Sequence, residues 1–174
     1  MLKFLLCIGI IALCGYIGQI NSKKYTYRLK ALSDFKEVIY LMDCDIRQQM
    51  YPLDVALKRR AEMSDKYLAG FLNECAQKIN TNPNERFEDI WKAAVSNYKD
   101  KSDFLLSLNK EEMKLIMQTG KRLVFDSDSS KGINAIINDY ELKIKKLSDI
   151  APGKQKLINA LSLFGGFLLV ILII

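Results

Sequence analysis

The chain contains no histidine among its 174 residues. That absence excludes a histidine-dependent catalytic triad, a zincin motif and any metal site with histidine ligands. The P-loop pattern is also missing, because the nearest string, Gly153-Lys154-Gln155, lacks the first glycine and the hydroxyl residue. The sequence therefore predicts no catalytic site, no metal site and no bound cofactor.

Tryptophan and cysteine are both scarce. Trp91, the only tryptophan, lies at a periodic apolar position and is predicted to be a core residue, and Gly120 in a similar stripe is predicted to face a close neighbouring helix. The four cysteines include no Cys-x-x-Cys pair, and we interpret all of them as small, reduced packing residues. They are at positions 7, 14, 44 and 75.

Charge is absent from two long stretches, Phe4 to about Ile20 and Leu157 to Ile174. A helix needs roughly 17 to 25 apolar residues to cross a bilayer, and both stretches reach the short end of that range. We therefore expect transmembrane helices over 1–21 and 157–174. A helical domain over 22–153 would lie between them.

The first span has a rival interpretation as a cleaved signal peptide, because Lys3 supplies a short basic region before it. Lys23 and Lys24 directly after the span are typical of a retained anchor instead. Basic residues crowd the inner flanks of both spans, which predicts a cytoplasmic central domain with both termini on the opposite side. Attraction of these residues to anionic membrane lipid accounts for the net charge of +6 without nucleic acid. The flanking residues are Lys23, Lys24, Arg28 and Lys30, then Lys143, Lys145, Lys146, Lys154 and Lys156.

Apolar residues in the central segment return every three or four positions, which predicts an all-α fold. Pro52 suits the first turn of a helix, Ser64 can cap another, and Asn109 with Glu112 resembles a capping box. Pro152-Gly153 is expected to separate the last helix from the second span. We predict a six-helix antiparallel bundle flanked by the two transmembrane helices. The expected helices cover about 29–46, 52–60, 64–79, 87–98, 109–124 and 133–147.

Carboxylates are plentiful but do not suggest acid–base chemistry. Asp43 and Asp45 are near neighbours in sequence, as are Glu111 and Glu112. Residues at such spacings point in different directions on a helix. We interpret these side chains as solvated helix surface.

Two segments are candidates for contact with a partner. Lys58, Arg59 and Arg60 form the one basic run away from both anchors, and they are either a solvated helix face or a contact for phosphate or an acidic partner. Tyr51-Pro52-Leu53 is either a docking knob or an ordinary corner between two helices. We keep these six residues as the candidate partner-binding site.

The chain resembles the stage III sporulation protein AB family, small relatives of the inner-membrane platform proteins of type II secretion and type IV pilus systems. The resemblance covers the whole length and rests on two terminal anchors around six helices together with short motifs. It departs over Leu123-Val124-Phe125-Asp126, where the family tends to carry Leu-Gly, an acidic residue and glutamine, and this leaves the role of the turn 126–130 open. The motifs are Ile39-Tyr40, Tyr51-Pro52-Leu53 with Ala56, Ile90-Trp91, Gly120 with Leu123, and Leu161 to Ile174 with Gly165.

This resemblance implies a non-enzymatic component of the channel or secretion-like complex between mother cell and forespore. The protein would lie in the outer forespore membrane with its central domain on the mother-cell side. That domain would dock onto sporulation protein AA, which resembles a secretion ATPase, and couple it to other channel components; a homodimer is also implied. The residues themselves leave open a membrane-tethered scaffold or signalling adaptor, while a lipid-modifying enzyme is disfavoured because neither span contains an ionisable residue.

Overall fold

The computed structural model describes residues 2–99, 101–123 and 130–173, and it describes side chains over 8–99, 101–123 and 132–171. Its secondary structure within these ranges is helical without strands, which confirms the predicted all-α class. The elements are α1 (Leu2–Arg47), α2 (Leu53–Met63), α3 (Lys66–Thr81), α4 (Phe87–Lys99), α5 (Asp103–Ser107), α6 (Lys110–Arg122) and α7 (Ser130–Ile173).

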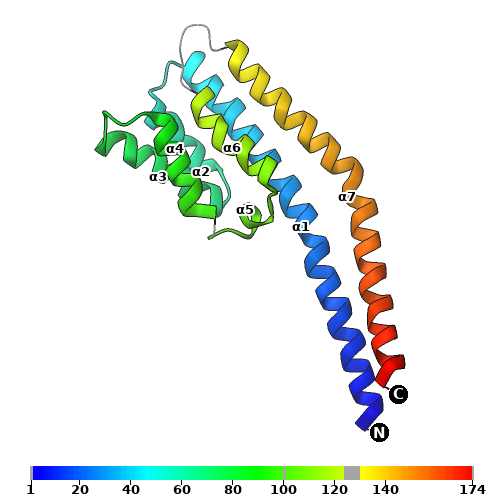
Figure 1. The fold of residues 1–174 in the computed structure, drawn as a ribbon. Coiled ribbons are helices and arrows are strands. Elements are labelled where there is room, and N and C mark those ends of the chain that lie inside the picture. The colour runs from blue at the N-terminus through cyan, green and yellow to red at the C-terminus, as the bar shows by residue number, and fades with distance from the viewer. Residues whose placement is uncertain (1, 100, 124–129, 174) are drawn as a thin grey trace.

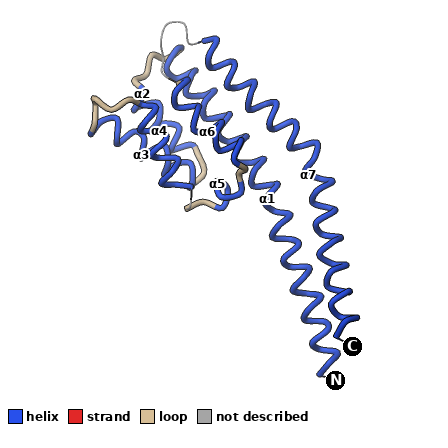
Figure 2. Tube along the Cα trace, viewed as in Figure 1, coloured by secondary structure: helices blue, strands red, loops and turns tan. Residues whose placement is uncertain are grey.

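Two long helices run through the molecule. α1 has 46 residues and α7 has 44, so each is roughly 65 to 70 Å long at 1.5 Å per residue. They lie side by side and antiparallel, with both chain ends together at one end of the molecule (Figure 1 and Figure 2). The helices α2 to α6 pack against the other half of this pair and form the bundle with it. We call the remaining two-helix extension, residues 8–22 and 155–171, the leg.

The bundle contains a continuous core of large apolar side chains. Trp91 is fully buried, and its indole N–H donates a hydrogen bond to the carbonyl oxygen of Ile116 at 2.8 Å. A Cβ added to Gly120 would lie 2.5 Å from the Cβ of Trp91, so only glycine lets α6 approach α4 this closely. Both core predictions are confirmed. Phe35, Phe71 and Phe87 surround the indole.

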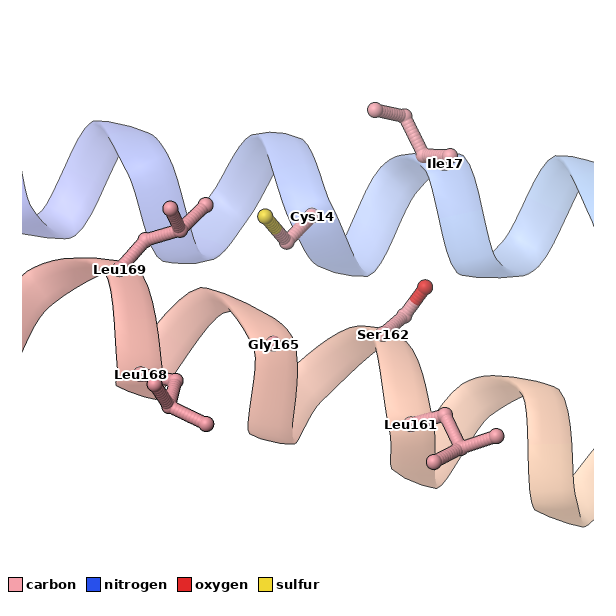
Figure 3. Close-up of a pocket in the computed structure, with 7 residues that line it drawn as sticks. All are labelled: Cys14, Ile17, Leu161, Ser162, Gly165, Leu168 and Leu169. Carbon is pink, nitrogen blue, oxygen red and sulfur yellow. The ribbon is translucent and has the colours of Figure 1, made fainter.

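The leg is packed differently, with small residues between its helices. Gly18 is buried and its added Cβ would lie 2.7 Å from the side chain of Ser162, while that of Gly166 would lie 3.1 Å from the Cβ of Cys14. Beside this contact is an apolar groove, where Ser162 and Leu169 point toward α1 (Figure 3). Large apolar side chains face outward, an arrangement typical of helices that pack together in lipid. They include Leu13, Tyr16, Phe164, Leu168 and Ile171.

Among the residues whose side chains are described, one helix is long and apolar enough to cross a membrane, over Gly132–Ile171 of α7. This agrees with membrane association through the second predicted span. The first predicted span begins at Phe4, and the side chains before Ile8 lie outside the described ranges. A second membrane crossing and the topology therefore stay predictions.

Several boundaries differ from those expected. The predicted break at Pro152-Gly153 is wrong, because α7 continues through Pro152. Figure 1 shows α7 bending midway along its length, the usual result of a proline inside a helix. Gln155 helps to hold it there by donating hydrogen bonds to the carbonyl oxygen of Ser22 at 3.2 Å and to Thr26 Oγ1 at 3.1 Å.

Two further differences concern the connections. The predicted cap at Ser64 is wrong, because Ser64 ends α2 and Asp65 precedes α3. The described helices number seven rather than the expected six in the bundle, since the short α5 lies between α4 and α6, and α1 and α7 each continue from bundle to leg. The turn 126–130 falls largely on residues 124–129, outside the described residues.

Candidate partner-docking surface at the α1–α2 corner

The candidate residues gather where the chain turns from α1 into α2. α1 ends at Arg47, and α2 begins after Pro52, so residues 48–52 form a tight corner. Because α1 runs from the leg into the bundle, this corner is at the end of α1 that is far from the leg (Figure 1). A contact made there would leave the leg free.

The corner depends on an unusual conformation at Met50. Its φ of 55° puts it in the left-handed region, which non-glycine residues seldom adopt. The turn brings the backbone N–H of Tyr51 to the carbonyl oxygen of Asp45 at 3.1 Å, and this hydrogen bond closes the end of α1. The Met50 side chain is 82% exposed and makes the apolar tip of the corner.

A buried ion pair supports the corner from inside. Arg60 of α2 and Asp45 of α1 are 7% and 2% exposed. Arg60 Nε is 2.8 Å from Asp45 Oδ2, although these two atoms lack hydrogen-bond geometry, and Arg60 Nη2 donates to Asp45 Oδ1 at 3.2 Å. The interpretation of Arg60 and Asp45 as solvated is therefore wrong. Their pairing joins α1 to α2.

The rest of the basic run is less buried, although Arg59 Nη1 also lies 3.6 Å from Asp45 Oδ1. Arg59 donates a hydrogen bond from Nη1 to Gln49 Oε1 at 2.7 Å, and its guanidinium carbon is 5.3 Å from the centre of the Tyr51 ring. Lys58 is exposed, and Val55 one turn before Arg59 is 40% exposed. Leu53 instead packs partly buried against the core.

We call Met50, Tyr51, Val55, Lys58 and Arg59 the corner surface. It combines an apolar tip with two cations, which suits a partner that offers an apolar pocket edged by carboxylates. Of the six predicted residues, Arg60 and Leu53 serve packing, Pro52 shapes the turn, and the other three belong to this surface. Met50 was missed, because methionine gives no sequence signal for a left-handed turn. Partner binding by any of these residues stays a prediction.

A second ion pair, in which the carboxylate is buried and the cation is half-buried, lies toward the leg. Arg28 of α1 holds Glu112 of α6 with two contacts, Nε to Oε2 at 3.0 Å and Nη2 to Oε1 at 2.6 Å. Glu112 also accepts from the backbone N–H of Asn109 at 2.9 Å, while Asn109 Oδ1 accepts from the N–H of Glu112 at 2.8 Å. The predicted capping box is confirmed, and the interpretation of Glu112 as solvated is wrong.

The described side chains contain no group of three or more cysteine and acidic residues that could hold a metal ion. Burial raises the pKa of the Cys75 thiol to about 12, so this side chain is a neutral packing residue at physiological pH. Hydrogen bonds to Asp65 and then Asp34 raise the pKa of Lys30. These shifts arise where helices pack together, and they do not mark a reactive centre.

Comparison with known proteins gives one match. The family model described as stage III sporulation protein AB matches residues 3–174, nearly the whole chain. No curated protein and no solved structure matches the chain.

Proposed function

The chain belongs to the stage III sporulation protein AB family, and on that premise we propose that it is a membrane platform coupling a cytoplasmic secretion-type ATPase to the channel complex between mother cell and forespore. The family acts in sporulation as a structural or assembly component and is not known as enzymatic. In this proposal the leg anchors the protein in the outer forespore membrane. The bundle, on the mother-cell side, receives the sporulation protein AA-like ATPase at the corner surface.

The separation of the two surfaces supports this division of labour. Outward-facing apolar residues of the leg, such as Leu13 at 63% and Phe164 at 70% exposure, suit lipid. The corner surface lies at the opposite end of α1 and combines exposed apolar and cationic side chains. A platform needs one surface for the membrane and another for a cytoplasmic partner, and this arrangement keeps them apart.

The observation that carries the proposal is the conformation of Met50. A left-handed non-glycine residue costs roughly 1 kcal/mol or more, and such outliers cluster at functional sites. Glycine or asparagine would make the same turn at a lower cost. A methionine that is 82% exposed adds nothing to the core in exchange, so we infer that its side chain serves contact with a partner.

The test removes the contact without weakening the fold. In the full-length chain, Met50→Asn eliminates the apolar tip and favours the left-handed turn, and Lys58→Glu reverses an exposed charge; Arg60 is left unchanged. Met63→Asn is the matched control for Met50→Asn, because Met63 is 67% exposed and lies at the end of α2, outside the corner surface. The measurements are capture of the AA-like ATPase by the detergent-solubilised chain and spore formation.

We expect the Met50→Asn/Lys58→Glu variant to be as stable as the parent and to lose ATPase capture and spore formation, while Met63→Asn retains both. Normal capture and sporulation by the stably expressed double variant would refute docking at the corner. Failure of the unaltered chain to capture the ATPase would overturn the coupling function and favour the scaffold or adaptor.

The proposed topology has its own test. We expect two membrane crossings, a cytoplasmic bundle and both termini on the other side. In a variant with all four cysteines replaced by alanine, a new cysteine at the exposed Asn82 is expected to resist impermeant reagents in intact cells, while one added after Ile174 reacts. The reverse labelling pattern would contradict this placement.

A further inference from the structure

Four lysines lie at one level, where the apolar surface of the leg ends. The hydrogen bonds from Gln155 to Ser22 and Thr26 fix the register of α1 and α7 there. Antiparallel pairing in this register sets Lys23 and Lys24 opposite Lys154 and Lys156. All four are exposed, and none takes part in an ion pair among the described residues. We call these four residues the lysine collar.

The short helix α5 reaches the same level from the bundle. Ser107, its last residue, lines a groove together with Asn21 and Lys24 of α1 and Ile158 of α7. Phe104 stacks on Tyr67 with ring centres 4.6 Å apart and meets the ring of Tyr27 at 4.9 Å. These contacts hold α5 against α1, and Figure 1 shows it at the edge of the bundle nearest the leg.

Leu106 is the exposed apolar side chain of α5. It is 52% exposed, whereas the neighbouring Leu105 is buried in the core. An exposed leucine alone does not indicate a binding surface, since folded proteins expose much apolar surface. The position of Leu106 is informative, because its segment lies beside the lysine collar and is flanked by the exposed Lys101 and Lys110.

We propose that α5 is a third membrane contact, in which Leu106 enters the headgroup layer of an anionic phospholipid surface while the lysine collar binds the phosphates. Two observations select this occupant. The contact is continuous with the apolar leg, and the collar has the charge complementary to anionic lipid. Each basic side chain near such a surface strengthens binding roughly fivefold.

The contact fixes the orientation of the bundle. Two helices crossing the bilayer would otherwise let the bundle tilt, and α5 on one side of the pair restrains that motion. The corner surface is thereby held away from the membrane. This inference rests on the membrane insertion of the leg proposed above.

The experiment places tryptophan at three positions of the full-length chain in phospholipid vesicles. Leu106→Trp reports on α5, and Phe164→Trp reports on the leg. Leu142→Trp is the matched control, because Leu142 is 67% exposed but lies far from the lysine collar. The preceding residue, Glu141, pairs with Lys36 of α1. Lys36 is 12 residues after Lys24, which places Leu142 roughly 18 Å further along α1. Trp91 is fully buried in each variant, so the signal of the parent chain is subtracted.

The vesicles contain lipids with a nitroxide quencher near the headgroup end of the acyl chain, with or without phosphatidylglycerol. In vesicles that contain phosphatidylglycerol, we expect quenching of Leu106→Trp to be at least about twofold greater than that of Leu142→Trp. This excess should fall in vesicles of phosphatidylcholine alone. It should also fall when Lys23, Lys24, Lys154 and Lys156 are replaced by glutamine.

The outcomes separate this inference from the proposed function. Strong quenching of Phe164→Trp with equal quenching at positions 106 and 142 would overturn the α5 contact and leave membrane anchoring intact. No quenching of Phe164→Trp would overturn both. If the excess quenching of Leu106→Trp is unchanged without phosphatidylglycerol and unchanged by the lysine substitutions, the role of the lysine collar is refuted.

Discussion

The pair of α1 and α7 is packed in opposite ways in the bundle and in the leg. In the bundle, large residues such as Phe35, Met42 and Tyr140 are fully buried, and most charged residues face outward. In the leg, Gly18 and Gly166 lie between the helices, and large residues such as Phe164 face outward. Water drives large apolar side chains inward. The small residues of the leg instead allow close contact between its two helices, the packing that is typical of helices in lipid, where this drive is absent.

This difference in packing predicts which mutations destabilise each part of the helix pair. The bundle also contains two ion pairs with buried carboxylates, Asp45–Arg60 and Arg28–Glu112, and each carboxylate needs a cation because the surrounding core cannot solvate a lone charge. The described side chains of the leg form no ion pair. In the bundle, we therefore expect the greatest loss of stability when one member of an ion pair is removed. In the leg, we expect it when a small residue is replaced by a larger one.

The largest effect is expected from Arg60→Met. This change removes the closer of two cations beside the buried carboxylate of Asp45 and leaves only Arg59, whose Nη1 is 3.6 Å from Oδ1. Breaking a buried pair lowers the free energy of unfolding by up to about 3 to 5 kcal/mol. Lys58→Met, two residues away on the exposed face, should change it by no more than about 0.5 kcal/mol. Chemical denaturation of the full chain in detergent, followed by Trp91 fluorescence, measures both.

A paired replacement sharpens this prediction. Asp45→Leu together with Arg60→Met removes both charges, and such exchanges are often neutral. We expect the double variant to recover most of the lost stability. Equal losses for the single and double variants would show that shape, and not the uncompensated charge, is responsible.

The second effect concerns Gly120 in the bundle. Gly120→Ala forces a Cβ to within 2.5 Å of Trp91, and overpacking of this kind costs about 1 to 3 kcal/mol. Gly132→Ala in α7 is the control, because its Cβ would meet nothing within 4 Å. There the better helix propensity of alanine should raise stability by about 0.5 to 1 kcal/mol. A gain at position 120 would contradict the close packing of α6 on α4.

The sequence allowed the fold class to be predicted but not the burial of charge. The period of three to four residues located the long helices, and the Asn109–Glu112 pattern located the start of α6, because both signals are local. Arg60 stands in a run of three basic residues that resembles solvated surface. Its burial follows from the position of Asp45 on another helix, and that position is a tertiary property.

Other features escaped for different reasons. α5 has five residues, too few for a period to show. Pro152 usually ends a helix, but here the packing of Ala151 and the hydrogen bonds of Gln155 hold α7 against α1 on either side of it. The left-handed conformation of Met50 is set by the geometry of the corner. The candidate docking surface could therefore be located by residues 51–60, but its apolar tip could not.

A smaller loss of stability is expected when a larger side chain is placed between the two helices of the leg. The test uses Gly166→Cys, whose Cβ would lie 3.1 Å from that of the native Cys14 and needs to move by only a few tenths of an ångström to reach the spacing of a disulfide. An added oxidant accepts the two electrons released when the two thiols form the disulfide. Adding Gly18→Val pushes against Ser162 Cβ, which can move only together with its backbone, so we expect a cost of at least about 1 kcal/mol. That cost would reduce disulfide formation at least about fivefold. Gly15→Val, which meets nothing within 4 Å, should leave it unchanged. Equal rates for both variants would contradict the register of the leg.

The smallest effect is a dependence on alkaline pH in the bundle. Hydrogen bonds to Asp65 and then Asp34 raise the pKa of Lys30 above its usual 10.5. A raised pKa in the folded state means that the stabilisation is complete below the pKa of the unfolded chain and is lost as the pH rises through the folded pKa. Because the Lys30 side chain is 43% exposed, solvent screening limits the stabilisation from its ion pairs to about 0.2 to 1 kcal/mol. Lys30→Met should therefore be less stable than the parent at neutral pH, and the difference should shrink as the pH rises above 10.5. Lys66→Met is the control, because Lys66 is exposed and forms no ion pair among the described residues. A stability difference for Lys30→Met that stays constant over this range would show that its ammonium group is not the source.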